Sequence, residues 1–395
     1  MSQLNYLEKL LDGVDVEWKS FGEIAKIQRG ASPRPIAKFI TDDEDGVPWI
    51  KIGDTESGSK YVEQTAQKIT KEGATKSRVL KKGDFIISNS MSFGRPYILN
   101  ITGAIHDGWA SISEFGDKLN SDFLYHYLSS QSVQNYWISK INSGSVSNLN
   151  ADIIKTLLVP IPCPNNPEKS LAIQAEIVRI LDAFTAMTAE LTAELNMRKK
   201  QYNYYRDQLL SFEEGEGVTP MSIGDIYDFQ YGKGNTIPKE GGQYPVYGSN
   251  GVVGTHHEYN SEDSPVIGHI GAYAGIVNWG KGKHFVTYNG VICKHKSKEV
   301  NPQFAYYILL AQDFGSKAKN SSQPFVSYDT LKEPVVLIPS LAEQERIVSI
   351  LDKFDALTNS ITEGLPREIE LRQKQYEYYR DLLLSFPKPH SHEAA

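Results

Sequence analysis

The chain repeats two of its own segments, and this duplication constrains the fold more than any other feature of the sequence. Residues 198–212 (RKKQYNYYRDQLLSF) and 372–386 (RQKQYEYYRDLLLSF) are identical at 12 of 15 positions. Residues 171–187 and 341–357 are identical at 10 of 17 positions. The first pair is offset by 174 residues and the second by 170, so the second copy has four more residues between its blocks. The duplication predicts a chain built from two related halves.

A weaker match opens each half. Residues 16–30 resemble residues 218–232 and share a valine, a serine, two glycines, an isoleucine and a glutamine. Between these anchors the two halves scarcely match. The pattern predicts a variable domain, a helix, a second variable domain and a second helix.

Both repeated regions are predicted to be helical, because apolar residues recur three or four positions apart from Ile173 to Leu195. From 171 to 212, 42 residues at about 1.5 Å each predict a rod of roughly 60 Å. Gly364 and Pro366 predict a break near 363–366, with Pro366 opening the next helix. Each apolar stripe is too narrow to stand alone, so the two helices are predicted to pack antiparallel about a pseudo-twofold axis. The residues expected to contribute to helix packing and partner docking are Tyr202, Tyr205, Leu209, Tyr376, Tyr379 and Leu383.

The variable regions are predicted to be mixed α/β domains. Strand-like runs, bounded by turn residues, occur at 47–54, 83–90 and 264–270. Short helices are expected at 121–130 and 301–312. Apolar strands at 157–162 and 335–339 are expected to close the two domains. The predicted class is α+β: two mixed α/β recognition domains separated by two long antiparallel helices. The expected boundaries are 1–157 for the first domain, 158–217 for the central helical region, 218–338 for the second domain, and 339–395 for the distal helical region and tail.

The composition narrows the class of protein. The 395 residues suggest at least two domains, and the net charge of -7 argues against a simple basic DNA-coating protein. The two cysteines, Cys163 and Cys293, are far apart and offer no cysteine-based zinc site. The first residues do not resemble a signal peptide, and no run of about 18 apolar residues occurs. We expect a cytoplasmic protein that does not contact a membrane.

Motifs that would indicate catalysis each fail at a required position. Residues 301–304 (NPQF) lack the second proline of an adenine methyltransferase motif and are predicted to cap a helix. Residues 275–281 begin like a P-loop, but Gly282 replaces the hydroxyl residue that binds magnesium. His256, His257 and Glu258 lack further ligands for a metal. The sequence predicts no catalytic or metal site in this chain.

The repeated blocks resemble those of specificity subunits of type I restriction-modification enzymes. The resemblance covers nearly the whole chain and rests on both RxKQYxYYRDxLLSF blocks, both LAxQxxIVxILDxF blocks, GLPREIELR at 364–372 and YPVYGSNGVVG at 244–254. Residues 161–174 and the tandem TAELTAEL at 188–195 are similar to the type IC subgroup.

This resemblance implies a non-catalytic subunit of a host-defence restriction system. Each variable region would be a target recognition domain for one half of a bipartite site in double-stranded DNA. The helices would space the domains and dock two methyltransferase subunits, and restriction/translocase subunits would complete the nuclease. S-adenosylmethionine, ATP and magnesium are expected on those partners, with no cofactor in this chain.

Candidate DNA contacts in the first domain are cations near small or turn residues. Cations bind phosphates and side chains specify bases. The candidates are Arg29, Arg34, Lys76, Arg78 and Arg95. The alternative for each is solvated surface charge.

The second domain has no arginine between Arg206 and Arg346. Arginine bound to guanine is the commonest specific contact, so we expect this half-site to depend less on arginine–guanine contacts. Residues 16–157 hold 17 basic and 16 acidic residues, and residues 218–338 hold 10 of each, so partner subunits are expected to supply much of the phosphate binding. The candidates here are Gln230, Lys233, Asn235, Asn250, Lys281, Lys283, Asn289, Lys317 and Lys319.

The tandem tetrapeptide lies between the matched blocks of the first helix and is marked by Thr188, Leu191, Thr192 and Leu195. Four residues advance a helix by about 6 Å and turn it by a net of about 40°, while one base pair advances about 3.4 Å and turns about 34–36°. The resemblance implies that the number of tetrapeptides sets the length of the non-specific spacer. The alternative is that TAEL is merely a good helix-forming filler.

Three other functions stay open at this level. The chain could be a scaffold for protein partners, a stand-alone enzyme with a split active site, or a subunit of a complex that only methylates. Salt-sensitive binding of DNA together with a methyltransferase partner would exclude the scaffold. An assay of the isolated chain tests for a stand-alone enzyme. The stoichiometry of a pull-down separates a complex that only methylates from a full restriction system.

Overall fold

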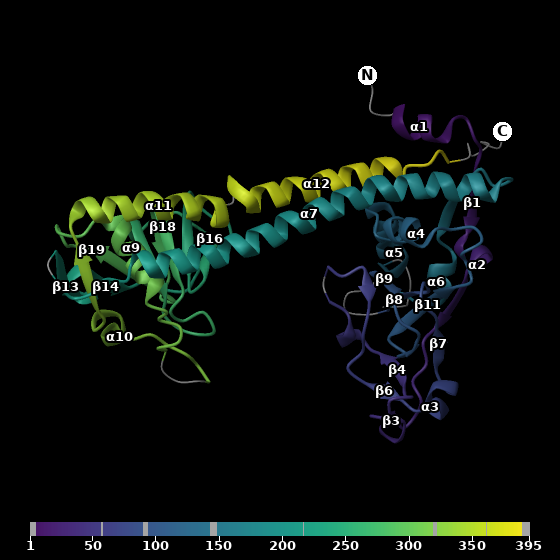
Figure 1. The fold of residues 1–395 in the computed structure, drawn as a ribbon, viewed down its shortest axis with the longest axis horizontal. Helices are drawn as coiled ribbons and strands as arrows, with labels where there is room; N and C mark the ends of the chain where they lie inside the picture. Colours follow the sequence, from purple (N-terminus) through teal and green to yellow (C-terminus); the bar gives the residue numbers. More distant parts are fainter. Residues whose placement is uncertain are drawn as a thin grey trace. The chain divides into compact units, whose positions relative to one another are not determined.

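The computed structural model describes residues 5–56, 58–89, 94–142, 148–215, 217–318, 322–360 and 362–388. The chain divides into two compact units, each with its own sheets (Figure 1). Unit 1 comprises Met1–Glu190 and Ile369–Ala395, and unit 2 comprises Leu191–Glu368. Each unit therefore joins one sheet domain to helical segments from two distant parts of the sequence.

The described part of unit 1 contains two five-stranded sheets and a two-stranded ribbon. The first sheet has the order β2-β11-β8-β9-β5 (Lys26–Arg29, Trp109–Ser113, Phe85–Ser88, Pro96–Leu99, Tyr61–Val62). The second has the order β3-β6-β4-β10-β7 (Ile40–Thr41, Lys68–Ile69, Val47–Ile50, Gly103–Ile105, Arg78–Leu80). The ribbon pairs β1 (Val16–Ser20) with β12 (Leu158–Pro162). The strand predicted at 47–54 ends early, because residues 52–54 form a 3-10 turn in which the Asp54 carboxylate accepts the Lys51 amide at 2.7 Å.

Strand β8 explains how the core of unit 1 is layered. All four of its residues are buried. Phe85 and Ile87 pack in one cluster with Phe123 of helix α4 (Ser121–Leu128), while Ile86 packs in a second cluster with Ile50 of the other sheet. Alternate residues of a strand point to opposite faces, so a strand covered on both faces needs a continuous apolar run. The helices of this domain are α1 (Asn5–Leu11), α2 (Phe21–Ile24), α3 (Lys71–Thr75), α4 (Ser121–Leu128), α5 (Gln131–Asn142) and α6 (Ala151–Lys155), with 3-10 turns η1 (Ile36–Lys38) and η2 (Ile52–Asp54).

Unit 2 is built around one six-stranded sheet in its described residues. Its order is β14-β19-β17-β18-β15-β16 (Tyr227–Tyr231, Gly290–His295, Ser261–Gly268, Val277–Val286, Tyr244–Gly248, Gly251–His256). A ribbon pairs β13 (Val218–Ser222) with β20 (Val335–Pro339), and the helices are α8 (Ile223–Ile226), α9 (Pro302–Ala311) and α10 (Tyr328–Lys332). The predicted cap of α9 is confirmed, because the Asn301 side chain accepts the amides of Gln303 and Phe304.

The long helices differ from the prediction at their ends. Helix α7 spans Pro167–Leu209 without interruption and contributes to both units. Helices α11 (Leu341–Asn359) and α12 (Gly364–Leu383) are separated where Ser360 Oγ accepts the amides of Thr362 and Glu363. The prediction that Pro366 opens the second helix is therefore wrong by two residues. Pro366 lies in the first turn of α12, where its missing N–H leaves no helical hydrogen bond unmade.

The antiparallel pairing of the helices is confirmed within each unit (Figure 1). In unit 1, Phe184 of α7 stacks on Tyr379 of α12, with ring centroids 5.1 Å apart. In unit 2, Tyr205 of α7 stacks on Phe354 of α11 at 5.7 Å. Phe184 matches Phe354, and Tyr379 matches Tyr205, in the sequence repeat. The two stacks are therefore equivalent, while a twofold relation between the units stays a prediction.

A buried glutamine anchors each recognition domain to its helix. Gln174 and Gln344 occupy matching positions of the repeat and are fully buried. Their side-chain oxygens accept the backbone amides of Asn120 and Asn301 at 2.8 and 2.7 Å. Each glutamine nitrogen donates to the carbonyl two residues before that asparagine, at 3.0 Å in both units. The start of α4 and the start of α9 are thus held in the same way.

The last described residues complete the core of unit 1. Leu383, Leu384 and Phe386 are each less than 7% exposed. The Phe386 ring meets Phe123 edge to face at 6.0 Å, and the Trp18 indole donates to the Pro387 carbonyl at 2.8 Å. Unit 1 therefore requires residues from both ends of the sequence.

Among the helices in the described ranges, none combines the length and the apolar character needed to cross a membrane.

We expect Phe386→Ala to destabilise unit 1 by about 3–5 kcal/mol, because it removes a buried aromatic ring. Hydrogen exchange should show lower protection of the amides in β8 and β11, with those in β17 and β19 unchanged. The control is Phe212→Ala, since Phe212 is the matching residue and packs against the core of unit 2. Equal loss of protection in both units for either variant would contradict this division.

Candidate nucleic-acid interface

A glycine fixes the first loop of unit 1 against a neighbouring turn. The Gly30 amide donates to the Trp109 carbonyl at 2.8 Å, which extends the pairing of β2 with β11. A Cβ atom at Gly30 would lie 2.1 Å from the carbonyl oxygen of His106, so no larger residue fits. Residues 31–38 therefore leave the sheet directly beside the turn at 106–108.

Asp107 organises this loop. Its carboxylate accepts the Ser32 hydroxyl at 2.9 Å and lies 3.0 Å from His106 Nε2 and 3.4 Å from Arg34 Nη2. Burial alone would raise the pKa of Asp107, but the Ser32 hydrogen bond and the nearby His106 and Arg34 outweigh it and lower that pKa. The Arg34 side chain nevertheless stays 83% exposed. Its guanidinium is thus oriented by Asp107 while remaining open to a ligand.

A cavity of about 690 Å³ lies between this loop and the second sheet. Lys51 and Gln67 line it, and the Lys51 ammonium donates to the Gln67 side-chain oxygen at 2.8 Å. The remaining lining comes from residues 32–37, Ile40, Trp49, His106 and Asp107. The cavity therefore combines an apolar wall with side chains that can donate hydrogen bonds.

Five polar residues of this cavity were not predicted from the sequence: Ser32, Lys51, Gln67, His106 and Asp107. Lys51 follows the strand-like run VPWI, and polar residues at the end of a strand were the only available signal. The pairing of β4 with β10, which places Lys51 beside His106, joins residues more than 50 positions apart and leaves no local pattern.

Three of the five first-domain candidates lie together, and the other two have different surroundings. Three arginines surround the turn at 106–108. The Nε atom of Arg29 lies 3.4 Å from the Asp107 carbonyl, Arg34 pairs with the Asp107 carboxylate, and Arg78 pairs opposite Ile105. Lys76 instead covers the Phe39 ring at 4.4 Å and pairs with Glu72. Arg95 lies over the Tyr97 ring at 5.4 Å, at the start of β9.

Unit 2 has the same arrangement of a glycine, a loop and a turn. The Gly232 amide donates to the Gly290 carbonyl at 2.9 Å, and a Cβ atom there would lie 2.1 Å from the Thr287 carbonyl oxygen. The Tyr288 amide then donates to the Gly234 carbonyl at 2.8 Å, and the Lys233 amide to the Val286 carbonyl at 3.0 Å. Gly232 matches Gly30 in the repeat, so both domains present equivalent loops.

An exposed tyrosine occupies the position in unit 2 that Asp107 holds in unit 1. Tyr288 is 47% exposed and its ring lies 5.9 Å from Tyr231 and 5.6 Å from His269. Tyr231 in turn stacks on Tyr328 at 4.3 Å. This surface is therefore aromatic where that of unit 1 is charged. Tyr288 was not among the residues predicted from the sequence.

Several second-domain candidates lie at this same end of the sheet. Lys233 and Asn235 belong to the glycine loop, and Asn289 belongs to the turn, where its carbonyl accepts the His269 amide at 2.8 Å. The turn containing Asn250 approaches the end of β17, since a Cβ atom at Gly268 would meet the Ser249 carbonyl at 2.4 Å.

The other second-domain candidates lie elsewhere or are already engaged. Lys281 and Lys283 lie near the start of β17, and Lys283 covers the Tyr259 ring at 4.7 Å. The Gln230 side chain accepts the Lys294 ammonium at 2.6 Å. Lys317 lies over the Phe314 ring at 5.7 Å. Lys319 lies outside the described residues.

Most of the residues selected on the helices are buried or half-buried within the chain, whereas Tyr205 is 46% exposed. Tyr202 and Leu383 are 6% and 2% exposed. Leu209 packs against the core of unit 2 and Tyr376 against that of unit 1. Exposed aromatic surface is instead offered by Tyr204 (61%) and Tyr378 (51%), which occupy matching positions of the repeat. The residues that mark the tandem tetrapeptide, Thr188, Leu191, Thr192 and Leu195, all lie within the uninterrupted α7.

The segment whose sequence resembles the start of a P-loop does not adopt the P-loop structure. Residues 277–282 belong to strand β18, which pairs with β17. A P-loop instead requires a glycine-rich loop that leads into a helix.

Comparisons with known proteins agree with this architecture. The family model for the type I restriction modification DNA specificity domain matches residues 13–198 and 215–371. The type I restriction enzyme EcoprrI specificity subunit of Escherichia coli is 36% identical over 379 residues, which cover 92% of this chain and 93% of that protein. The EcoR124I/EcoR124II specificity subunit, also of Escherichia coli, is 37% identical over 98% of this chain and 99% of that protein.

Solved structures share the fold at lower identity. A chain from a study of complex assembly and conformational transition in the type I R-M system has a TM-score of 0.64 at 14% identity, over 93% of this chain and 97% of that one. The S subunit of a type I restriction-modification system from M. genitalium has a TM-score of 0.51 at 17% identity, over 95% and 98%. With two sheet domains, duplicated helices and a family match over both halves, the chain belongs to the type I restriction-modification DNA specificity subunits, the non-catalytic subunits that give these enzymes their sequence specificity.

Proposed function

We propose that each sheet domain recognises one half of a bipartite site in double-stranded DNA. The observation that carries this proposal is the duplicated arrangement of a glycine, a loop and a turn at Gly30 and Gly232. Two equivalent loops on two otherwise different domains suit the recognition of two different half-sites. Methylome mapping of cells that express this chain with a methyltransferase partner tests the proposal. A continuous methylated site would contradict it.

The two domains would use different chemistry. In unit 1, Arg29, Arg34 and Lys51 provide donors for guanine or phosphate, and the apolar wall of the cavity suits a thymine methyl group. In unit 2, Lys233 belongs to the loop and Asn289 to the turn that holds the exposed Tyr288, Asn250 lies in a turn near the end of β17, and the domain has no arginine. Asparagine suits adenine better than guanine.

We further propose that the helices dock two methyltransferase subunits. Tyr204 and Tyr378 support this because they are exposed, aromatic and placed at matching positions of the repeat. Aromatic residues are enriched at protein interfaces. S-adenosylmethionine, ATP and magnesium would be bound by those subunits and by restriction/translocase subunits. The assignment to subgroup IC and the presence of a restriction partner remain proposals, which the stoichiometry of a pull-down from cells tests.

We expect Lys51→Met to relax base preference at one position of one half-site, at a cost of about 1–3 kcal/mol in discrimination. Methylation rates on duplexes with single-base changes measure the effect. The control is Lys19→Met, because Lys19 pairs with Glu17 on the ribbon, away from the cavity. Unchanged preference in the Lys51 variant, or altered preference in both half-sites, would remove Lys51 from the recognition surface.

We expect deletion of Thr192–Leu195 to shorten the spacer by one base pair and to leave both half-sites unchanged. The helix loses about one turn, with a net rotation close to that of one base pair. Replacement of the same four residues by alanines keeps the length of the helix and should keep the spacer. Methylated-site mapping of both variants checks this, and an unchanged spacer after the deletion refutes it.

We expect Asn250→Ala to weaken discrimination in one half-site only, and that half-site to contain few guanines contacted by this chain. The reason is that unit 2 offers amides and lysines in place of arginine. The methylome and the single-base duplex panel measure both. A guanine-rich half-site contacted by arginines of this chain would show that the expectation is wrong.

A further inference from the structure

A fully buried histidine connects three elements of unit 1. His126 lies on α4 and is 0% exposed. Its Nε2 lies 2.9 Å from the carboxylate of Asp182 on α7, and its Nδ1 lies 2.8 Å from the hydroxyl of Tyr376 on α12. One imidazole therefore links the recognition domain to both helices of its unit.

The hydrogen bonds define the state of this ring. A carboxylate only accepts, so Nε2 carries the hydrogen and Nδ1 accepts from the Tyr376 hydroxyl. Burial lowers the pKa of His126 although the Asp182 hydrogen bond opposes the change, and this direction favours the neutral ring. A neutral imidazole has one donor and one acceptor, and both are used here.

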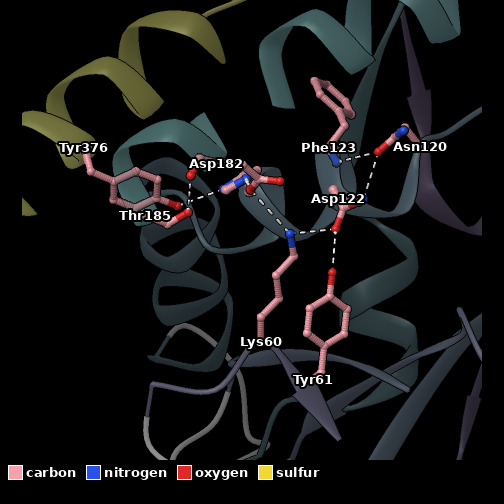
Figure 2. A network of polar contacts seen from close by, with 9 residues as sticks. Lys60, Tyr61, Asn120, Asp122, Phe123, Asp182, Thr185 and Tyr376 are labelled. Atoms are coloured by element: carbon pink, nitrogen blue, oxygen red, sulfur yellow. Dashed lines mark hydrogen bonds and ion pairs between the residues drawn. The ribbon is translucent and has the colours of Figure 1, made fainter. Parts of the chain in front are cut away.

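Lys60 adds a second connection at the same place. Figure 2 shows Lys60 and Asp122 on one side of Asp182, with Tyr376 on the other. The Lys60 ammonium lies 2.6 Å from Asp122 and 3.5 Å from Asp182, and the Tyr61 hydroxyl donates to Asp122 at 3.2 Å. Lys60 directly precedes β5, the edge strand of the first five-stranded sheet, so these contacts connect that edge to α4 and α7.

Unit 2 repeats the helix side of this junction but not the domain side. Asp352 and Tyr202 match Asp182 and Tyr376 in the repeat. Tyr307 follows its capping asparagine by six residues, as His126 follows Asn120.

The tyrosine that stands in unit 2 at the position of His126 changes the hydrogen bonds of the junction. The Tyr307 hydroxyl donates to Asp352 at 2.5 Å, and the buried Tyr202 hydroxyl has no hydrogen-bond partner among the described residues. The identical helical residues are therefore bridged fully in unit 1 and only partly in unit 2.

We propose that His126 is a positioning residue, which holds the first recognition domain in one orientation on α7 and α12 and thereby fixes the spacing at which its half-site is recognised. This inference rests on the proposed recognition of a bipartite site. The side-chain hydrogen bonds of His126 run to α7 and α12 and not to the loop at 31–38 or the turn at 106–108, so it acts on spacing and not on the identity of the bases.

The test measures two ratios with the full chain in complex with its methyltransferase subunits. One is methylation of duplexes with the cognate spacer against duplexes with one base pair more or fewer. The other is methylation of cognate against single-base-changed half-sites. Tyr376→Phe should lower the first ratio by roughly fivefold, as expected for loss of one buried hydrogen bond, and leave the second unchanged. Tyr202→Phe, the matched control, should change neither, because its hydroxyl is unbonded.

A second variant separates positioning from simple damage to the fold. His126→Tyr copies unit 2, so it should keep the bond to Asp182, fold, and lower the spacer ratio as Tyr376→Phe does. Combining both substitutions should add nothing to either alone, because both remove the same hydrogen bond.

Three results overturn the proposal: a spacer ratio unchanged in Tyr376→Phe, an equal fall of both ratios, or additive effects in the double variant. Failure of the unaltered complex to methylate any bipartite site would instead overturn the proposed function. The two failures are thus distinguishable.

Discussion

A single helix cannot bury its own apolar stripe, and the rest of the structure depends on how this chain meets that constraint. Ile173, Ile177 and Leu181 of α7 are buried in unit 1, while Tyr202 of the same helix is buried in unit 2. The covering helices, α12 and α11, come from a later segment interrupted between Asn359 and Gly364. The four extra residues of the second copy fall in this region, so they form a break where the first copy continues as helix.

Buried polar groups then specify where each domain attaches along its helix. An apolar stripe alone permits sliding, because burial depends little on direction. Gln174 and Gln344 each satisfy a backbone amide at the start of a domain helix, and a shifted domain would leave these buried groups unsatisfied. Each such group costs about 1–3 kcal/mol. Hydrophobic contact therefore supplies affinity between domain and helix, and the glutamines supply register.

The parts of the structure that the sequence predicts are those with a local or repeated pattern. The long helices, the cap at Asn301 and the closing strands at 157–162 and 335–339 follow from periodicity and turn residues. Strand β8 was predicted within 83–90 although it is buried on both faces, whereas the two-residue strands β3, β5 and β6 were not predicted, because two residues show no periodicity. Of the basic residues that line the cavity, Arg34 was selected from the sequence, but Lys51 and His106 were not, because they meet only through the parallel pairing of β4 with β10. Long-range pairing leaves no trace in a short window of sequence.

The junction shows why equivalent helical residues can hold unlike domains. An aspartate and a tyrosine on the helices present one acceptor and one hydroxyl to whatever side chain the domain supplies. An imidazole has nitrogens on two edges and reaches both groups, whereas a phenol has one oxygen and reaches only the carboxylate. The helices therefore accept either domain side chain, but the histidine binds both helical groups and the tyrosine binds only the carboxylate. The Tyr202 hydroxyl lacks a partner among the described residues, whereas the matching Tyr376 hydroxyl binds His126.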